Sequence, residues 1–160
     1  MILLADDQED DVFLTKEALV RAQVLNPLYV VADGTEAIQY LEGSGKFGNR
    51  NEYPLPDLLL LDLNMPRLNG FDVIRWVRAH PTLSNLRIVV QSSSDLDLDI
   101  NKAHELGANA YMVKTGDFHT YCAAMRTTIS FWLQLTRSPS LSRSDAVKRT
   151  SDQSQVTSDQ

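Results

Sequence analysis

The chain is poor in the residues that mark several large classes of protein. Its single cysteine, Cys122, excludes an internal disulfide and is read as a helix-packing residue. No apolar stretch is long enough to cross a bilayer, and the N-terminus lacks a signal-peptide layout, so we expect a cytoplasmic protein without membrane contact. The three histidines, His80, His104 and His119, lack metal-ligand spacing and are read as surface residues.

A basic surface is also missing. The net charge is −6, from 15 Lys and Arg against 21 Asp and Glu, which argues against nucleic acid as a partner. The 160 residues suit one domain with a substantial core, expected over 1–136. Residues 137–160 are rich in Ser, Thr, Asp and Gln, and we expect a flexible tail there, too short and polar to be an output domain.

What the chain does have is an unbroken apolar run, Leu58–Leu61, followed directly by Asp62. A run of aliphatic residues without alternation predicts a strand buried on both faces, as in the middle of a parallel sheet. Pro66 cannot donate to a strand ladder, so the strand must have ended before it. The carboxylate of Asp62 therefore lies at the C-terminal edge of the sheet, where open α/β sheets bind ligands.

A second apolar run, Ile2–Ala5, ends in Asp6 and Asp7. If the two runs are neighbouring parallel strands, these carboxylates converge on Asp62. Two carboxylates ~4 Å apart repel by about 4 kcal/mol at an effective dielectric near 20, so they stay ionised together only around a cation. All-oxygen ligands without His or Cys favour a hard divalent ion, and Mg²⁺ is the cofactor we expect.

Two further apolar runs end in polar residues of a different kind. Ile88–Val90 is followed by Gln91 and Ser92, and Ala110–Val113 is followed by Lys114. One polar strand end means little, but these strand ends together carry metal ligands, an acceptor carboxylate, a hydroxyl and an ammonium. The sequence therefore predicts one site at this edge of the sheet.

Helical patterns alternate with these strands, and a further strand is expected at Leu28–Val31. The alternation predicts a parallel sheet with helices on both faces. Residues 43–56 are read as a polar loop whose GSGK segment is not a phosphate-binding loop. The expected helices run from a cap at Asp10 or Asp11 to about Ala22, from a cap at Thr35 to near Gly43, from Gly70 to His80, from about Asp95 to Leu106, and from a cap at Asp117 to about Leu135.

The motifs Asp6-Asp7, Leu-Leu-Asp62-Leu-Asn-Met-Pro, Val-Val-Gln-Ser92 and Tyr111-Met-Val-Lys114 together resemble the receiver domain of two-component response regulators. The resemblance runs from Met1 to about Trp132. It implies an α/β fold, a doubly wound five-stranded parallel sheet in the flavodoxin-like order 2-1-3-4-5. It also implies a stand-alone receiver that signals through protein contacts and catalyses only its own phosphorylation and dephosphorylation.

The resemblance implies a role for each site residue. Asp62 would accept a phosphoryl group from a phosphohistidine on a sensor histidine kinase. Asp7, Asp62 and the Asn64 carbonyl would bind Mg²⁺, with Asp6 acting mainly through water. Lys114 and Ser92 would contact the phosphoryl oxygens, and Tyr111 would be the aromatic switch whose ring turns inward.

The sequence departs from the receiver pattern at two positions. Ser92 stands where Thr is usual, which weakens the coupling to Tyr111, and Thr115 stands where a cis proline usually follows the lysine. A cis bond before a non-proline residue costs about 2.5–4 kcal/mol, so we expect the Lys114–Thr115 bond to be trans. These departures keep open a receiver-fold binding module that is never phosphorylated. An aspartyl-phosphate hydrolase is the third reading, but Asn64 stands where its acid would be.

Two softer features resemble the single-domain regulators that serve phytochrome-type histidine kinases. One is the extended segment before the Asp62 strand, and the other is the ending Ile-Ser-Phe-Trp-Leu over 129–133. We therefore expect a phytochrome as one candidate kinase. Because Phe131 and Trp132 are of the types enriched at interfaces, we also expect a homodimer through the C-terminal helix.

Overall fold

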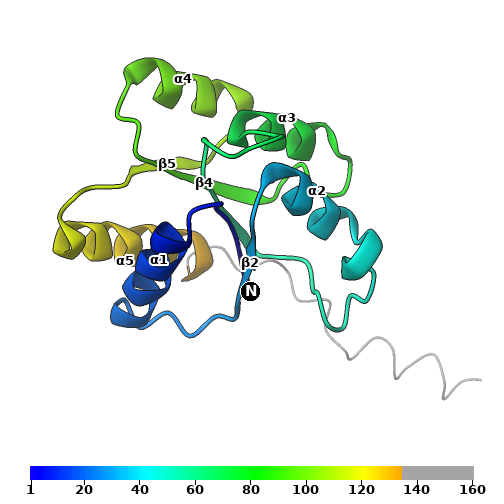
Figure 1. Ribbon diagram of the computed structural model, residues 1–160, viewed down its shortest axis with the longest axis horizontal. Helices are drawn as coiled ribbons and strands as arrows, with labels where there is room; N and C mark the ends of the chain where they lie inside the picture. Colours follow the sequence, from blue (N-terminus) through cyan, green and yellow to red (C-terminus); the bar gives the residue numbers. More distant parts are fainter. Residues whose placement is uncertain (135–160) are drawn as a thin grey trace, which may run out of the picture.

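The computed structural model describes residues 1–134, and its centre is a sheet of five parallel strands (Figure 1). The strands lie in the order β2-β1-β3-β4-β5, which confirms the predicted order. Each pairs in parallel with its neighbours. Their bounds are β1 Ile2–Ala5, β2 Leu28–Val31, β3 Leu58–Leu61, β4 Arg87–Ser92 and β5 Ala110–Val113.

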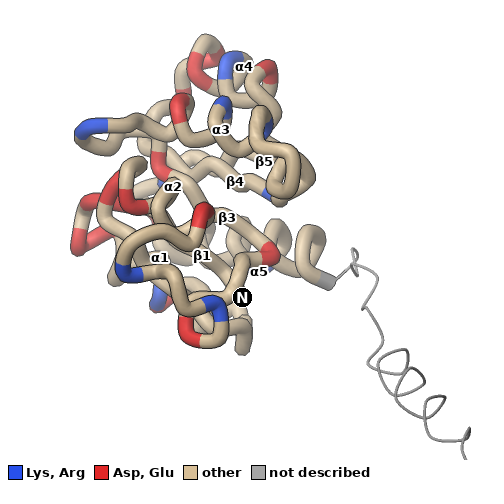
Figure 2. The backbone as a smooth tube through the Cα atoms, turned by 90° about the vertical axis from the view of Figure 1, so that its right-hand side faces the viewer, with Lys and Arg blue, Asp and Glu red and all other residues tan. Residues whose placement is uncertain are grey.

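Helices cover both faces of this sheet. One face carries α1 (Glu9–Arg21) and α5 (Phe118–Gln134), which contact each other. The other carries α2 (Gly34–Glu42), α3 (Gly70–Ala79) and α4 (Asp97–Leu106), packed in sequence order. The turned view in Figure 2 likewise places α3 and α4 above the strands and α5 below them. In the part of the chain that the structure describes, no helix combines the length and apolarity needed to cross a bilayer.

Two apolar layers follow from the alternation of side chains along each strand. Leu3, Leu59 and Leu61 point toward α2, α3 and α4, whereas Leu4 and Leu60 point toward α1 and α5. All five are fully buried, which is why the strands read as continuous apolar runs rather than alternating ones. Cys122 packs against the layer under α1 and α5, as predicted.

Two predicted helix caps are wrong. Helix α1 begins at Glu9, so neither Asp10 nor Asp11 caps it; its N-cap is Gln8, which makes no side-chain cap bond. Helix α2 is capped by Asp33 rather than Thr35, because an Asp33 carboxylate oxygen accepts the Glu36 N–H at 2.7 Å. Asp117 does cap α5, accepting hydrogen bonds from the backbone N–H groups two and three residues on.

The 43–56 segment is more ordered than a polar loop. It contains the short 3₁₀ helix η1 (Gly45–Phe47), and Phe47 and Tyr53 pack against Tyr40 with ring centroids 5.0 and 6.0 Å away. Arg50 ties the segment to the end of α2 by donating to the Leu41 carbonyl at 2.7 Å. The expected tail, residues 137–160, lies outside the described residues.

Candidate phosphoacceptor site

The acidic cluster forms because β1 and β3 are neighbours in register. Ala5 pairs with Leu61, so Asp6 and Asp62, the next residue of each strand, leave the sheet side by side. Asp6, Asp7 and Asp62 each present a carboxylate oxygen, and these three atoms lie within 4.8 Å of one another. The structure therefore brings together the three carboxylates that the sequence placed at one edge.

Asp62 is held in an environment that disfavours its charge. The residue is 5 % exposed and Asp6 is 2 % exposed. Burial is the main cause that raises the pKa of Asp62 to about 6; the nearby ammonium of Lys114 opposes the rise and the charge of Asp6 adds to it. The backbone N–H of Asn64 donates weakly to Asp62 Oδ1 at 3.4 Å and favours the charged form. A further cation beside this carboxylate would favour its charged form.

The residues present fit a hard divalent cation. Asp7 Oδ1 is buried and has no hydrogen-bond partner among the described residues, so one lone pair is free for a ligand. The donor set is made only of oxygens, the chemistry that Mg²⁺ and Mn²⁺ accept. Asn64 is exposed beside this cluster, on the segment that follows Asp62.

Lys114 reaches the acidic cluster from the end of β5. Its Nζ lies 2.9 Å from Asp6 Oδ2, 2.8 Å from Asp11 Oδ2 and 3.8 Å from Asp62 Oδ1. Burial opposes the charged form of Lys114, but its hydrogen bonds to Asp11 and Asp6 outweigh that effect, and its pKa is raised. The contact with Asp11 was not predicted, because that residue was expected to cap a helix.

Ser92 and Tyr111 both form hydrogen bonds with Ser94. Ser92 is fully buried at the end of β4, and its Oγ accepts the backbone N–H of Ser94 at 3.2 Å. The Tyr111 hydroxyl donates to the backbone carbonyl of Ser94 at 2.9 Å. Ser94 Oγ in turn donates to Asp99 at the start of α4 at 2.6 Å. The predicted switch residues are therefore linked through the β4–α4 loop.

The segment after Asp62 is packed too closely to admit another side chain. A Cβ added to Gly70 would lie 2.4 Å from the Asp62 carbonyl oxygen, so only glycine lets α3 begin this close to the site. Asn69 and Asp72 form a reciprocal capping box that starts the helix there. Arg67, with φ of 66°, reaches back to Asp33 at 3.4 Å. The position of Asp62 is thereby supported from both ends of the loop.

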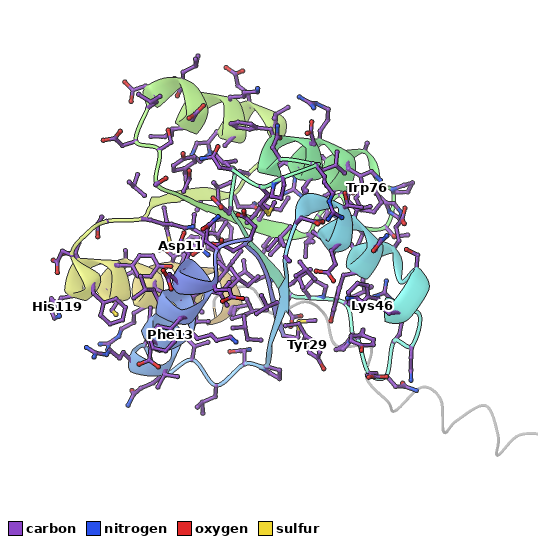
Figure 3. The ribbon with its side chains drawn as sticks, viewed as in Figure 1. Asp11, Phe13, Tyr29, Lys46, Trp76 and His119 are labelled. Carbon is purple, nitrogen blue, oxygen red and sulfur yellow. The ribbon has the colours of Figure 1, made fainter. Side chains whose placement is uncertain are left out.

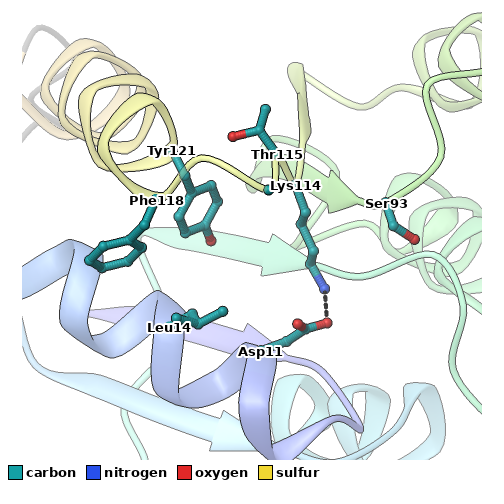
Figure 4. Close-up of a pocket in the computed structure, with 8 residues that line it drawn as sticks. Asp11, Leu14, Ser93, Lys114, Thr115, Phe118 and Tyr121 are labelled. Carbon is teal, nitrogen blue, oxygen red and sulfur yellow. Dashed lines mark hydrogen bonds and ion pairs between the residues drawn. The ribbon is translucent and has the colours of Figure 1, made fainter.

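A cavity of about 360 Å³ opens beside Lys114 (Figure 4). Leu14, Phe118 and Tyr121 form its apolar side, and Asp11, Ser93 and the 114–116 segment form its polar side. Lys114 therefore lines a hollow between α1 and α5.

No cis peptide bond occurs among the described residues, so the Lys114–Thr115 bond is trans, as predicted.

These features agree with a known family. Residues 2–126 match the model of the response regulator receiver domain, and the chain belongs to that family. Its relatives include phytochrome response regulators. The response regulator Rcp1 of Synechocystis sp. is 30% identical over 139 residues, covering 87% of this chain and 92% of Rcp1.

Solved structures give the same relationship. The phosphorylated cyanobacterial phytochrome response regulator RcpA is similar with a TM-score of 0.78 and 34% identity, covering 87% of this chain and 97% of RcpA. A response regulator in red light signaling of R. palustris is similar with a TM-score of 0.81 and 35% identity, covering 86% and 96%. The structure of Rcp1 that was solved in its Mn²⁺-bound form gives a TM-score of 0.76 at 30% identity, covering 86% and 97%.

Proposed function

We propose that this chain is a response regulator that accepts a phosphoryl group on Asp62 from a sensor histidine kinase. The observation that carries the proposal is the position of Asp62 at the strand edge, within reach of two further carboxylates and one ammonium. No carboxyl group stands at position 64, so the chain lacks the acid that an aspartyl-phosphate hydrolase would use.

In the proposed reaction an Asp62 carboxylate oxygen attacks the phosphorus in line. The new O–P bond forms as the N–P bond of the phosphohistidine breaks, and the imidazole leaves. A divalent cation held by Asp6, Asp7 and Asp62, with the Asn64 carbonyl as a further ligand, would supply positive charge beside the transferring group. Lys114 supplies the second positive charge, since its ammonium needs to move little to reach it.

The switch follows from the hydrogen bonds around Ser94. In the described state the Ser92 hydroxyl is held by the Ser94 N–H. Contact with a phosphoryl oxygen would draw it away, and the Ser94 carbonyl that anchors Tyr111 would shift with the loop. Phosphorylation would thus bias one of two packings of the β4–α4 loop and α4, and the chain would signal through altered protein contacts.

A phytochrome-type kinase is the donor we propose, because phytochrome response regulators are among the relatives that align over most of this chain. The predicted homodimer through α5 remains a proposal. Phe131 is 51 % exposed there, whereas Trp132 packs partly against the layer under α1 and α5.

The first experiment incubates purified protein with Mg²⁺ and acetyl phosphate and measures intact mass. We expect one acid-stable, base-labile phosphoryl group on the wild type and on Asp10→Asn, but none on Asp62→Asn. Asp10 is the matched control because it is exposed on the first turn of α1. An unlabelled wild type would favour the binding module, and continuous hydrolysis of phosphate esters would favour the hydrolase.

The second experiment tests the donor. Purified histidine kinases, one of them a phytochrome, are autophosphorylated and mixed briefly with the wild type. We expect the phytochrome to transfer its phosphoryl group faster than the others. Equal transfer from every kinase would reject the phytochrome assignment and leave the phosphoacceptor role standing.

A further inference from the structure

The ammonium of Lys114 is closer to Asp11 than to the phosphoacceptor. Its Nζ is 2.8 Å from Asp11 Oδ2, within hydrogen-bond distance, but 3.8 Å from Asp62 Oδ1, beyond it. Asp11 lies at the start of α1, where the helix approaches the strand ends (Figure 3). Figure 4 shows the Lys114 side chain directed at this carboxylate. In the described state Asp11 and Asp6 therefore hold the lysine to one side of Asp62.

The two carboxylates that hold Lys114 differ in how easily they can release it. The Asp6 side chain has no exposed surface, and its second oxygen is engaged by the Gln8 N–H at 3.0 Å. The Asp11 side chain is 35 % exposed, so water can replace the ammonium when that bond opens. Breaking the contact with Asp11 is consequently the less costly way to free Lys114 for another anion.

We propose that Asp11 is a positioning residue that competes with the phosphoryl group for Lys114 and so restrains phosphorylation of Asp62. The inference rests on the proposed function, since it assigns a regulator to the same site. Asp6 and Asp11 take two of the three N–H donors of the ammonium, so a phosphoryl group that arrives beside Asp62 has to share Lys114 with Asp11 or displace it. In a conformer in which Lys114 stays with Asp11, the Asp11 carboxylate offsets part of the positive charge that the transfer uses.

Replacing Asp11 with asparagine keeps the size of the side chain and removes its charge. We expect Asp11→Asn to raise the rate of phosphorylation by acetyl phosphate about fivefold. Such a factor corresponds to the loss of one partly exposed charged hydrogen bond. Asp10→Asn is the matched control, since it removes the same charge from the preceding residue, for which the structure describes no ion pair, and it should leave the rate near that of the wild type.

A Lys114→Gln background separates competition for the lysine from a general field effect. If Asp11 acts through the ammonium, its replacement should change the rate of the Lys114→Gln protein by less than twofold. A fivefold gain that persists without the ammonium would overturn the proposal, as would equal rates for Asp11→Asn and Asp10→Asn. Thermal unfolding of each variant confirms that the compared proteins are folded.

A measurement without phosphoryl transfer distinguishes failure of this inference from failure of the proposed function. The NMR signal of the Lys114 ammonium, assigned by its loss in Lys114→Gln, should shift in Asp11→Asn and not in Asp10→Asn. Beryllofluoride should then bind Asp11→Asn about fivefold more tightly than the wild type. If the wild type is not phosphorylated but both results hold, the proposed function fails, and the proposal that Asp11 holds Lys114 stands. An unshifted NMR signal in Asp11→Asn rejects the proposal that Asp11 holds Lys114.

Discussion

The buried charge of Asp62 gives a prediction for stability that needs no knowledge of the kinase. In metal-free protein, Asp62→Asn should be more stable than the wild type above pH 7 and lose that advantage as the pH falls. The reason is that Asp62 is 5 % exposed and faces two other carboxylates, so its ionised form is unfavourable in the folded state. The neutral amide carries no such cost.

The magnitude follows from the pKa. Burial raises the pKa of Asp62 from 3.8 to about 6 in the folded protein. At about 1.4 kcal/mol per pH unit, the rise corresponds to about 3 kcal/mol. Because the folded state binds this proton more tightly than the unfolded state, the stabilisation is present below the unfolded pKa. It is lost as the pH rises through about 6.

The assay compares urea unfolding of the wild type and Asp62→Asn between pH 4 and pH 8 in a chelator. Titrating groups far from Asp62 are shared by both proteins, so they cancel in the difference between the two free energies of unfolding. That difference should grow by about 2.4 kcal/mol from pH 4 to pH 8, because more than half of the unfolded chains have already lost this proton at pH 4. The change is roughly 7 °C in melting temperature for a chain of this size. Millimolar Mg²⁺ at pH 8 should stabilise the wild type selectively and so reduce the difference in free energy of unfolding between the wild type and Asp62→Asn.

A difference that stays flat over this pH range would refute the reasoning. It would mean that Asp62 titrates near its ordinary value, and that the pairing with Lys114 offsets the effect of burial. Asp10→Asn should follow the wild type throughout, because that residue is exposed.

Three further predictions concern the metal ligands and the supports of the site. Asp7→Asn should weaken Mg²⁺ binding about tenfold or more by isothermal titration calorimetry, since Asp7 Oδ1 is the buried oxygen without a protein partner. Gly70→Ala should lower the free energy of unfolding by about 2 kcal/mol in urea, because its Cβ would lie 2.4 Å from the Asp62 carbonyl oxygen; Gly116→Ala, which meets nothing, is the control. Asp33→Ala should cost about 1 kcal/mol in thermal unfolding through loss of the α2 cap, whereas Thr35→Ala should cost less.

The position of the acidic cluster could be predicted because it depends only on strand order and on where apolar runs end. Leu58–Leu61 and Ile2–Ala5 are buried on both faces, so their limits are unambiguous in the sequence. Once β1 and β3 are neighbours, the carboxylates that follow them have to meet. The order of the strands came from the family resemblance rather than from the residues themselves.

The features that were missed depend on details of side-chain geometry. The start of α1 was placed too late because an Asp6 oxygen accepts the Gln8 N–H, and that bond turns the chain into the helix earlier. The cap of α2 is Asp33 and not the predicted Thr35, since both residue types favour helix starts and an Asp-Gly pair is equally typical of a tight turn. A Cβ on Gly34 would lie 2.2 Å from the Leu68 carbonyl, a contact that no local pattern reveals.

The position at which α1 begins decides what the Asp11 carboxylate binds. Had Asp11 capped α1, its carboxylate would have accepted backbone N–H groups of its own helix. With α1 beginning at Glu9, that carboxylate is free to bind Lys114. The site then holds the carboxylates of Asp6, Asp7, Asp11 and Asp62. All but that of Asp7 lie within 3.8 Å of the Lys114 ammonium. The net negative charge of these groups attracts a divalent cation but repels an anionic phosphodonor. The position of the Lys114 ammonium therefore decides how much negative charge a donor meets. Of the three carboxylates that contact the ammonium, that of Asp11 is the most exposed and so the one that can most easily release it.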